Sequence, residues 1–192
     1  ILGADKDCCL GESAYVDVVF ANEGGWNLTY MVDGQTIQDG TFTAAHDSLA
    51  ITPLQEGTKT YTITRVSNAY CSKELNESLE ITAYRYPTLS VVIDSHICEP
   101  TPLNVSLHAT GGAPWEVVYY MNGLRYEHEM TTEEDVVTYT TYQDKNTFLF
   151  ESITSGERCK TILGTEINNV VGLLPRDAKK IEGYSNVCRN SS

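Results

Sequence analysis

The sequence is short of basic residues and has no long apolar run. Its 13 lysines and arginines stand against 26 aspartates and glutamates, which gives a formal net charge of −13. Proteins that bind nucleic acid present a basic face to the phosphates, so this charge balance excludes nucleic acid as the expected partner. A membrane-spanning helix needs about 20 consecutive apolar residues. No segment approaches that length, so we do not expect this part of the chain to enter a membrane.

Motifs for catalysis and for metal binding are missing as well. The six cysteines include no Cys-x-x-Cys pair and the four histidines are scattered, so a zinc site is not expected. Neither a nucleophile elbow of the Gly-x-Ser-x-Gly type nor a phosphate-binding glycine loop occurs. The carboxylates at positions 133–135 form a charge run of the kind that solvated loops carry. The sequence therefore predicts no enzyme, no cofactor and no metal site.

Calcium at the domain junctions stays open as an alternative. Four acidic residues lie near the expected junctions and would offer the oxygen ligands that calcium takes: Asp5, Asp7, Asp94 and Glu99. Their spacing is not that of an EF-hand loop, so junctions without metal are the main expectation.

The chain contains an internal repeat. Three features recur at an offset of 89 residues, namely a cysteine, a tryptophan and a hairpin dipeptide: Cys9 and Cys98, Trp26 and Trp115, and positions 33–34 and 122–123. A further cysteine pair, Cys71 and Cys159, recurs at an offset of 88. Composition alone would not keep such different residues in register, so the sequence predicts two copies of one unit, residues 1–86 and 87–174.

The end of the chain resembles the start of a third copy. Cys188 stands 90 residues after Cys98, and Pro175 precedes Cys188 much as Pro87 precedes Cys98. We therefore interpret residues 175–192 as the first strand of a truncated third repeat, with a tail as the alternative. Because no signal peptide opens the chain, we expect a mature segment of a longer protein, with Cys188 pairing beyond the chain.

Each copy has the pattern of a series of short strands. Threonine, valine and tyrosine are abundant, and apolar side chains alternate with polar ones. The expected strands of the first copy are residues 14–20, 26–32, 40–44, 48–51, 60–66 and 75–84. Asp33-Gly34 is a strong hairpin signal, and Trp26 opens the strand at 26–32, which corresponds to the third strand of such folds, where a tryptophan is often buried. The pattern predicts an all-β fold of two tandem immunoglobulin-like β-sandwiches.

The cysteines are interpreted as disulfides, because they are widely separated and lack metal-ligand spacing. The repeated spacing predicts a Cys98–Cys159 bond and a Cys9–Cys71 bond, each closing a loop of roughly 60 residues. Cys8 is an alternative to Cys9, or a partner for a preceding repeat. Disulfides form in oxidising compartments, so we expect an extracytoplasmic protein, at the cell surface or secreted, with the endoplasmic or perinuclear lumen as the alternative.

Four Asn-x-Ser/Thr sequons are candidate glycosylation sites: Asn27, Asn76, Asn104 and Asn190. About two would arise by chance at this content of asparagine, serine and threonine. The sequons therefore favour a eukaryotic lumen only slightly.

One segment of each copy resembles a known repeat family. Residues 97–99 (ICE) with 111–119 (GGAPWEVVY) resemble the opening signature of Ig-like/PKD-like repeats in very large surface proteins of Bacteroidota, and residues 60–71 (TYTITRVSNAYC) resemble their closing motif. Gly25 departs from that signature, which has a proline there. The resemblance implies cell-surface adhesins, gliding-motility filaments or exported spacers. The lumenal Ig-like repeats of fungal nuclear-pore membrane ring proteins are a second resemblance, through the tryptophan and the repeat length.

Two classes of function follow. The first is a structural or adhesive repeat module, acting as a spacer or interaction array whose partners are neighbouring repeats; a lumenal repeat of a nuclear-pore membrane ring scaffold is its alternative. The second is a module that binds a glycan or a protein through exposed aromatic side chains: Tyr84, Tyr86, Tyr139 and Tyr142. A contiguous aromatic patch on one copy alone would favour the second class.

Overall fold

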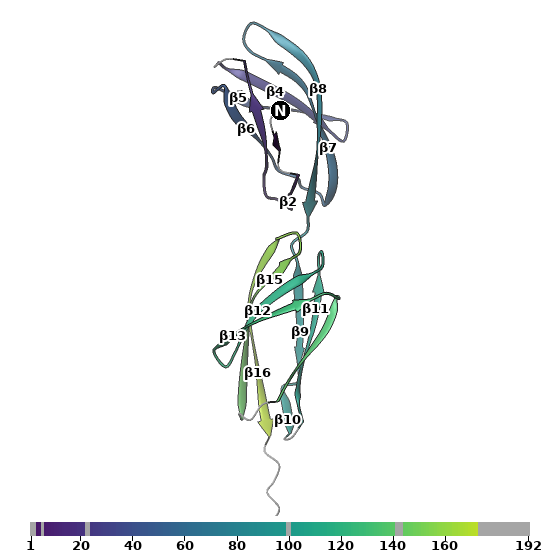
Figure 1. The fold of residues 1–192 in the computed structure, drawn as a ribbon, viewed down its shortest axis with the longest axis vertical. Coiled ribbons are helices and arrows are strands. Elements are labelled where there is room, and N and C mark those ends of the chain that lie inside the picture. The colour runs from purple at the N-terminus through teal and green to yellow at the C-terminus, as the bar shows by residue number, and fades with distance from the viewer. Residues whose placement is uncertain (1–2, 5, 22–23, 99–100, 141–143, 173–192) are drawn as a thin grey trace, which may run out of the picture.

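The computed structural model describes residues 3–4, 6–21, 24–98, 101–140 and 144–172. These residues form two β-sandwiches that follow one another along the long axis of the molecule (Figure 1). We call them sandwich 1, which ends with β8 at Tyr84, and sandwich 2, which begins with β9 at Thr88. The described residues form no helix that is long and apolar enough to cross a membrane.

Sandwich 1 consists of a three-stranded and a five-stranded sheet. The smaller sheet has the order β1 (Gly3–Ala4), β3 (Ala14–Val19), β6 (His46–Ile51). The larger sheet has the order β2 (Asp7–Cys9), β8 (Ser72–Tyr84), β7 (Gly57–Ser67), β4 (Trp26–Val32), β5 (Gln35–Phe42). In the larger sheet β2 runs parallel to β8 and the other pairs are antiparallel.

Sandwich 2 repeats this plan strand for strand. Its smaller sheet has the order β9 (Thr88–Ile93), β11 (Leu103–Thr110), β14 (Glu134–Tyr139). Its larger sheet has the order β10 (His96–Cys98), β16 (Lys160–Gly172), β15 (Lys145–Ser155), β12 (Trp115–Met121), β13 (Leu124–Met130). The two tandem immunoglobulin-like sandwiches expected from the sequence are thereby confirmed, whereas the expected third copy at 175–192 lies outside the described residues.

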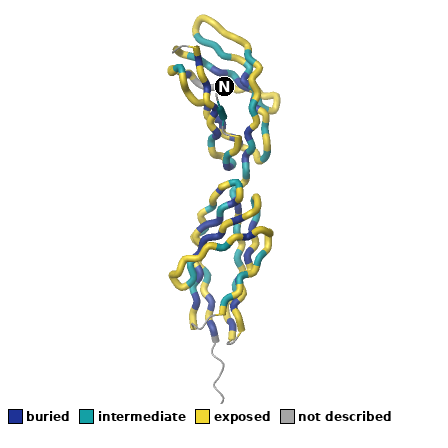
Figure 2. The backbone as a smooth tube through the Cα atoms, in the orientation of Figure 1, coloured by how far each residue is buried: buried dark blue, intermediate teal, exposed yellow. Residues whose placement is uncertain are grey.

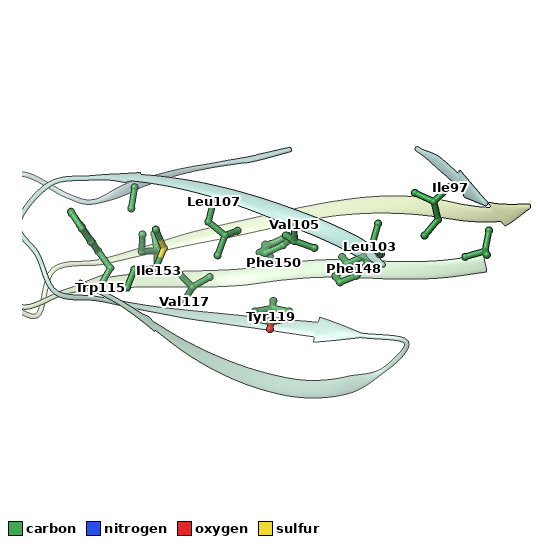
Figure 3. Close-up of a cluster of buried hydrophobic side chains, with 13 residues drawn as sticks. Ile97, Leu103, Val105, Leu107, Trp115, Val117, Tyr119, Phe148, Phe150 and Ile153 are labelled. Carbon is green, nitrogen blue, oxygen red and sulfur yellow. The ribbon is translucent and has the colours of Figure 1, made fainter. Parts of the chain in front are cut away.

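The cores lie between the two sheets of each sandwich. On β11 every second side chain is buried, and Leu103, Val105 and Leu107 point towards Phe148 and Phe150 of the opposite sheet (Figure 3). Buried and exposed residues alternate in the same way along β3 of sandwich 1, and both classes occur throughout the two sandwiches (Figure 2). Two separate clusters result, with no buried residue in common. Each sandwich therefore has its own core.

The hairpin dipeptides have the geometry that their residues favour. Asp33 and Gly34 have φ of 49° and 76°, and Asn122 and Gly123 have φ of 52° and 82°. Two successive positive φ values are typical of the tight turn that suits twisted hairpins. Because this turn lets Val32 pair with position 35 directly, β5 begins at Gln35 and not at 40, where the sequence pattern placed a strand.

Candidate functional site at the junction of the two sandwiches

A disulfide joins the two sandwiches. Cys9, at the end of β2, is bonded to Cys159, in the connection between β15 and β16. The two cysteines are 150 residues apart in sequence, and their Cα atoms lie 5.6 Å apart. Cys159 is completely buried and Cys9 is 8% exposed. The bond therefore fixes the adjoining ends of the sandwiches to each other and is shielded from solvent.

This pairing corrects the expectation of Cys98–Cys159 and Cys9–Cys71 bonds within single sandwiches. Cys98 pairs in register with Gly172 at one end of β16, whereas Cys159 precedes the other end of that strand. A strand of 13 residues is roughly 40 Å long at about 3.3 Å per residue. A disulfide requires Cα atoms within about 7 Å. The equally long β8 separates Cys9 from Cys71 in the same way.

The remaining cysteines take different positions. Cys71 and Cys98 are exposed and form no disulfide, and Cys8 is half-buried next to Cys9. Cys9 is therefore the bonded member of the adjacent pair, but its partner is not the expected one. Cys188 lies outside the described residues.

The backbone around Cys9 is tied to the strand that leads into the linker. Cys9 lies opposite Tyr84, the last residue of β8, and the N–H of Leu10 donates to the Tyr84 carbonyl oxygen at 2.8 Å. The N–H of Gly11 donates to the carbonyl oxygen of Pro53 at 3.1 Å. The disulfide is thus anchored on the element that continues into sandwich 2.

Sandwich 2 holds the linker from the other side. The hydroxyl of Thr161 donates to the carbonyl oxygen of Pro87 at 2.6 Å, and Pro87 is buried. Gly111 has a φ of +86°, and a Cβ there would lie 3.0 Å from the Cα of Pro87. Only glycine combines this backbone conformation with such a close approach without strain. The linker therefore lies directly against the near end of sandwich 2.

A polar contact ties the linker to sandwich 1. The hydroxyl of Tyr86 donates to Oε1 of Glu12 at 2.6 Å, and this hydrogen bond to a carboxylate is the main cause that raises the pKa of Tyr86. Arg85 and Glu56 form an ion pair at 2.8 Å, but both are well exposed and such pairs contribute little. Sequence reasoning missed the roles of Tyr86 and Glu12, which are adjacent only in the fold.

The indole that opens β12 is buried in sandwich 2, beside the glycine that packs against the linker. Trp115 is 3% exposed, and its Nε1 donates to the carbonyl oxygens of Thr110 and Gly111 at 3.2 and 3.0 Å. Its counterpart Trp26 is half-buried. The expectation of a buried tryptophan therefore holds fully for sandwich 2 and in part for sandwich 1.

The acidic residues are spread out: within the described ranges, no group of three or more His, Cys, Asp or Glu side chains is placed to hold a metal ion. Asp5 and Glu99 lie outside those ranges, Asp7 is on β2, and Asp94 follows β9. In the charge run at 133–135, Asp135 lies 2.9 Å from Nε2 of His128. The hydrogen bonds from His128 and from the N–H of Val136 lower the pKa of Asp135. They engage the carboxylate in contacts within sandwich 2.

The sequons differ in accessibility. Asn76 on β8 and Asn104 on β11 are exposed, so a glycan would meet no core residue there. Asn27 is half-buried and accepts a hydrogen bond from the hydroxyl of Thr41 at 3.1 Å. Asn190 lies outside the described residues.

The aromatic residues considered for binding do not form an exposed patch. Tyr84 and Tyr86 are half-buried at the junction. Tyr139 is half-buried against Phe148 and hydrogen-bonded to the hydroxyl of Tyr119, and burial raises its pKa. The expected exposure of these three tyrosines is therefore wrong, because each is half-buried. Tyr142 lies outside the described residues.

Comparisons with known proteins establish the fold. An I-band fragment from titin superposes with a TM-score of 0.53 at 12% identity, covering 88% of this chain and 62% of that one. A Glu-to-Ala variant of the three-Ig titin fragment gives 0.52, with the same identity and coverage. The match to a 1.5-MDa bacterial ice-binding adhesin, at a TM-score of 0.40 and 9% identity over 85% of this chain and 58% of that one, is too weak to compare folds.

The chain thus spans less than two thirds of the titin fragments that it matches. No known protein-family profile matches it, and neither does any curated protein sequence. Sequence identities this low support a shared fold, but they do not support a specific family or function. Together with the repeated strand plan, they show that the chain is built of tandem immunoglobulin-like repeats.

Proposed function

We propose that this chain is a non-catalytic structural or adhesive module of a larger exported protein, which acts by setting distance and orientation. The junction carries the proposal. Two separate cores are held end to end by a buried disulfide, a three-residue linker, and hydrogen bonds to that linker from both sandwiches. Domains joined by a free linker would tumble independently. A junction fastened in this way favours a fixed spacing.

The chemistry of the junction supports an extracytoplasmic location. A structural disulfide persists in oxidising compartments and is rare in the cytosol. The resemblance to repeats of Bacteroidota surface proteins agrees with a cell-surface or secreted array. A lumenal repeat of a nuclear-pore membrane ring scaffold is the alternative, and the exposed sequons at Asn76 and Asn104 are compatible with it.

A dedicated glycan- or protein-binding module is the less supported function. Such a module would present a contiguous aromatic patch on one copy. Tyr84, Tyr86 and Tyr139 are instead half-buried in structural positions. Neighbouring repeats are therefore the partners that we propose first.

Small-angle scattering on the purified, oxidised chain tests the proposal. A fixed end-to-end arrangement predicts the profile of a rod, with a radius of gyration well above the ~16 Å expected for one globule of this length. With the Cys71 and Cys98 thiols blocked by alkylation, the profile should not change with concentration. A compact profile, or one that requires a broad mixture of inter-sandwich angles, would contradict a spacer of fixed geometry.

A further inference from the structure

The far end of sandwich 1 carries an open apolar groove. Its volume is about 450 Å³, and its lining includes Phe20, Trp26, Val66, Leu75 and the exposed Cys71. The ring of Phe20 stacks on that of Trp26 with centroids 5.8 Å apart. The groove is thus a mainly apolar surface with a thiol at its edge.

The equivalent end of sandwich 2 is the end that lies at the junction. Cys159 and Trp115 occupy the positions of Cys71 and Trp26 in the repeat. Cys159 is completely buried and bonded to Cys9 of sandwich 1, and Trp115 is 3% exposed. Thr161, which binds the linker carbonyl, corresponds to position 73. The residue there is Lys73, which lines the groove and also carries a hydrogen-bond donor.

The far end of sandwich 2 carries the complementary thiol. Cys98 ends β10 and pairs in register with Gly172, the last residue of β16, just as Cys9 ends β2 and pairs with Tyr84, the last residue of β8. Cys98 is exposed. The molecule therefore presents both halves of its own junction, one at each end.

We propose that the groove beside Cys71 is a docking site for the Cys98-bearing end of another sandwich of this repeat, closed by a disulfide in the manner of Cys9–Cys159. The inference deepens the proposed function, on which it rests, by naming the partner and the bond. Each repeat would then be joined covalently to the next through two points, its linker and a disulfide. The resulting array would resist bending at every junction.

The bond forms by thiol–disulfide exchange with a small disulfide such as oxidised glutathione. The thiolate of one cysteine attacks the oxidant, forms a mixed disulfide and releases one glutathione thiolate. The second cysteine thiolate then attacks the protein sulfur of the mixed disulfide and releases the other glutathione. Two protein thiols lose two electrons and two protons, and one glutathione disulfide becomes two thiols.

Two single variants test the pairing between copies of this chain. All proteins carry Cys8→Ser and Cys188→Ser, and one carries Cys71→Ser while the other carries Cys98→Ser. In a glutathione redox buffer each variant alone should stay monomeric, and a mixture should form a heterodimer linked through Cys71 and Cys98. We expect at least about tenfold more heterodimer than either homodimer, the ratio given by a tenfold preference in docking affinity.

A groove variant separates docking from random oxidation. Val19 lines the groove and is 43% exposed, so Val19→Asp is compatible with folding, and it should reduce heterodimer formation to the level of the homodimers. Val136→Asp, at a residue that is 55% exposed on sandwich 2, is the matched control and should leave the yield unchanged. Homodimers as abundant as heterodimers, no cross-link, or no effect of Val19→Asp would overturn the inference. A rod-like scattering profile would still support the spacer function in that case.

Discussion

Side chains from separate parts of the chain hold the linker in place. Thr161 contributes a hydroxyl to the carbonyl oxygen of Pro87, Glu12 accepts from Tyr86, and Gly111 leaves room for the proline. None of these contacts is large by itself, since a typical hydrogen bond contributes about 1 kcal/mol net. Their combined effect is to restrict the few bonds about which one sandwich could rotate against the other.

The Tyr86–Glu12 contact predicts a specific pH dependence. The pKa of Tyr86 is raised in the folded protein, so its contribution to stability is fully present below the unfolded value of about 10 and is lost as pH rises through the folded pKa. Tyr86→Phe should therefore lose less stability than the parent protein between about pH 9 and pH 12. Denaturant unfolding at a series of pH values measures the difference.

Tyr70→Phe is the control for this prediction, because Tyr70 is 94% exposed. Its alkaline stability profile should follow that of the parent chain. A Tyr86→Phe profile parallel to the parent at all pH values would mean that the hydrogen bond does not persist in solution.

At the scale of the elements, the long strands and tight hairpins decide where the cysteines and loops lie. β8 and β16 each have 13 residues and run the full length of their sandwiches, so residues that flank the two ends of such a strand cannot meet. The hairpin between β12 and β13 is closed by Asn122 and Gly123, which both have positive φ. The turn residues thus fix the register of the larger sheet. The length of these strands determines at which end of its sandwich each cysteine lies.

The hairpin glycine provides a test at this scale. Gly123 has a φ of +82°, and the space beside it is open, so Gly123→Val should destabilise sandwich 2 through backbone strain alone. The expected cost is about 1–2 kcal/mol. Leu124→Ala, at a neighbouring residue that is 65% exposed, should change stability by no more than about 0.5 kcal/mol. Denaturant midpoints of the two variants measure the contrast, and equal midpoints would count against the strained turn.

At the scale of the whole molecule, the disulfide couples two cores that are otherwise separate. It closes a loop of 150 residues that contains most of both sandwiches. In the chain-entropy account, such a cross-link stabilises by restricting the unfolded chain. The stability of each sandwich should therefore depend on the other, although they share no buried residue.

Cys9→Ser should separate the two sandwiches energetically. The chain-entropy account gives up to about 5 kcal/mol of lost stability for this loop length. Calorimetry should show unfolding at lower temperature, with two transitions more clearly resolved than in the parent. Cys71→Ser removes an exposed thiol that forms no disulfide and should leave the thermogram unchanged. Identical thermograms for Cys9→Ser and the parent would contradict a stabilising bridge between the sandwiches.

Local patterns in the sequence were sufficient to predict the fold. Alternation predicted the strand at Trp26–Val32 with its observed bounds, and β3 differs by one residue at its end. The recurring cysteine, tryptophan and hairpin predicted the duplication, which the repeated strand order confirms. These features depend on residues close together in the chain, where periodicity and turn chemistry act.

The tertiary structure alone decided the cysteine pairing and the covering of aromatic residues. The repeat placed Cys98 and Cys159 in one unit, but β16 separates them, and the neighbour of Cys159 comes from the other sandwich. Likewise Trp115 is buried in the core of sandwich 2, whereas Trp26 is half-buried at the equivalent position of sandwich 1. Such contacts join residues far apart in sequence. They depend on how the two folded sandwiches are arranged against each other. No local pattern of residues encodes that arrangement.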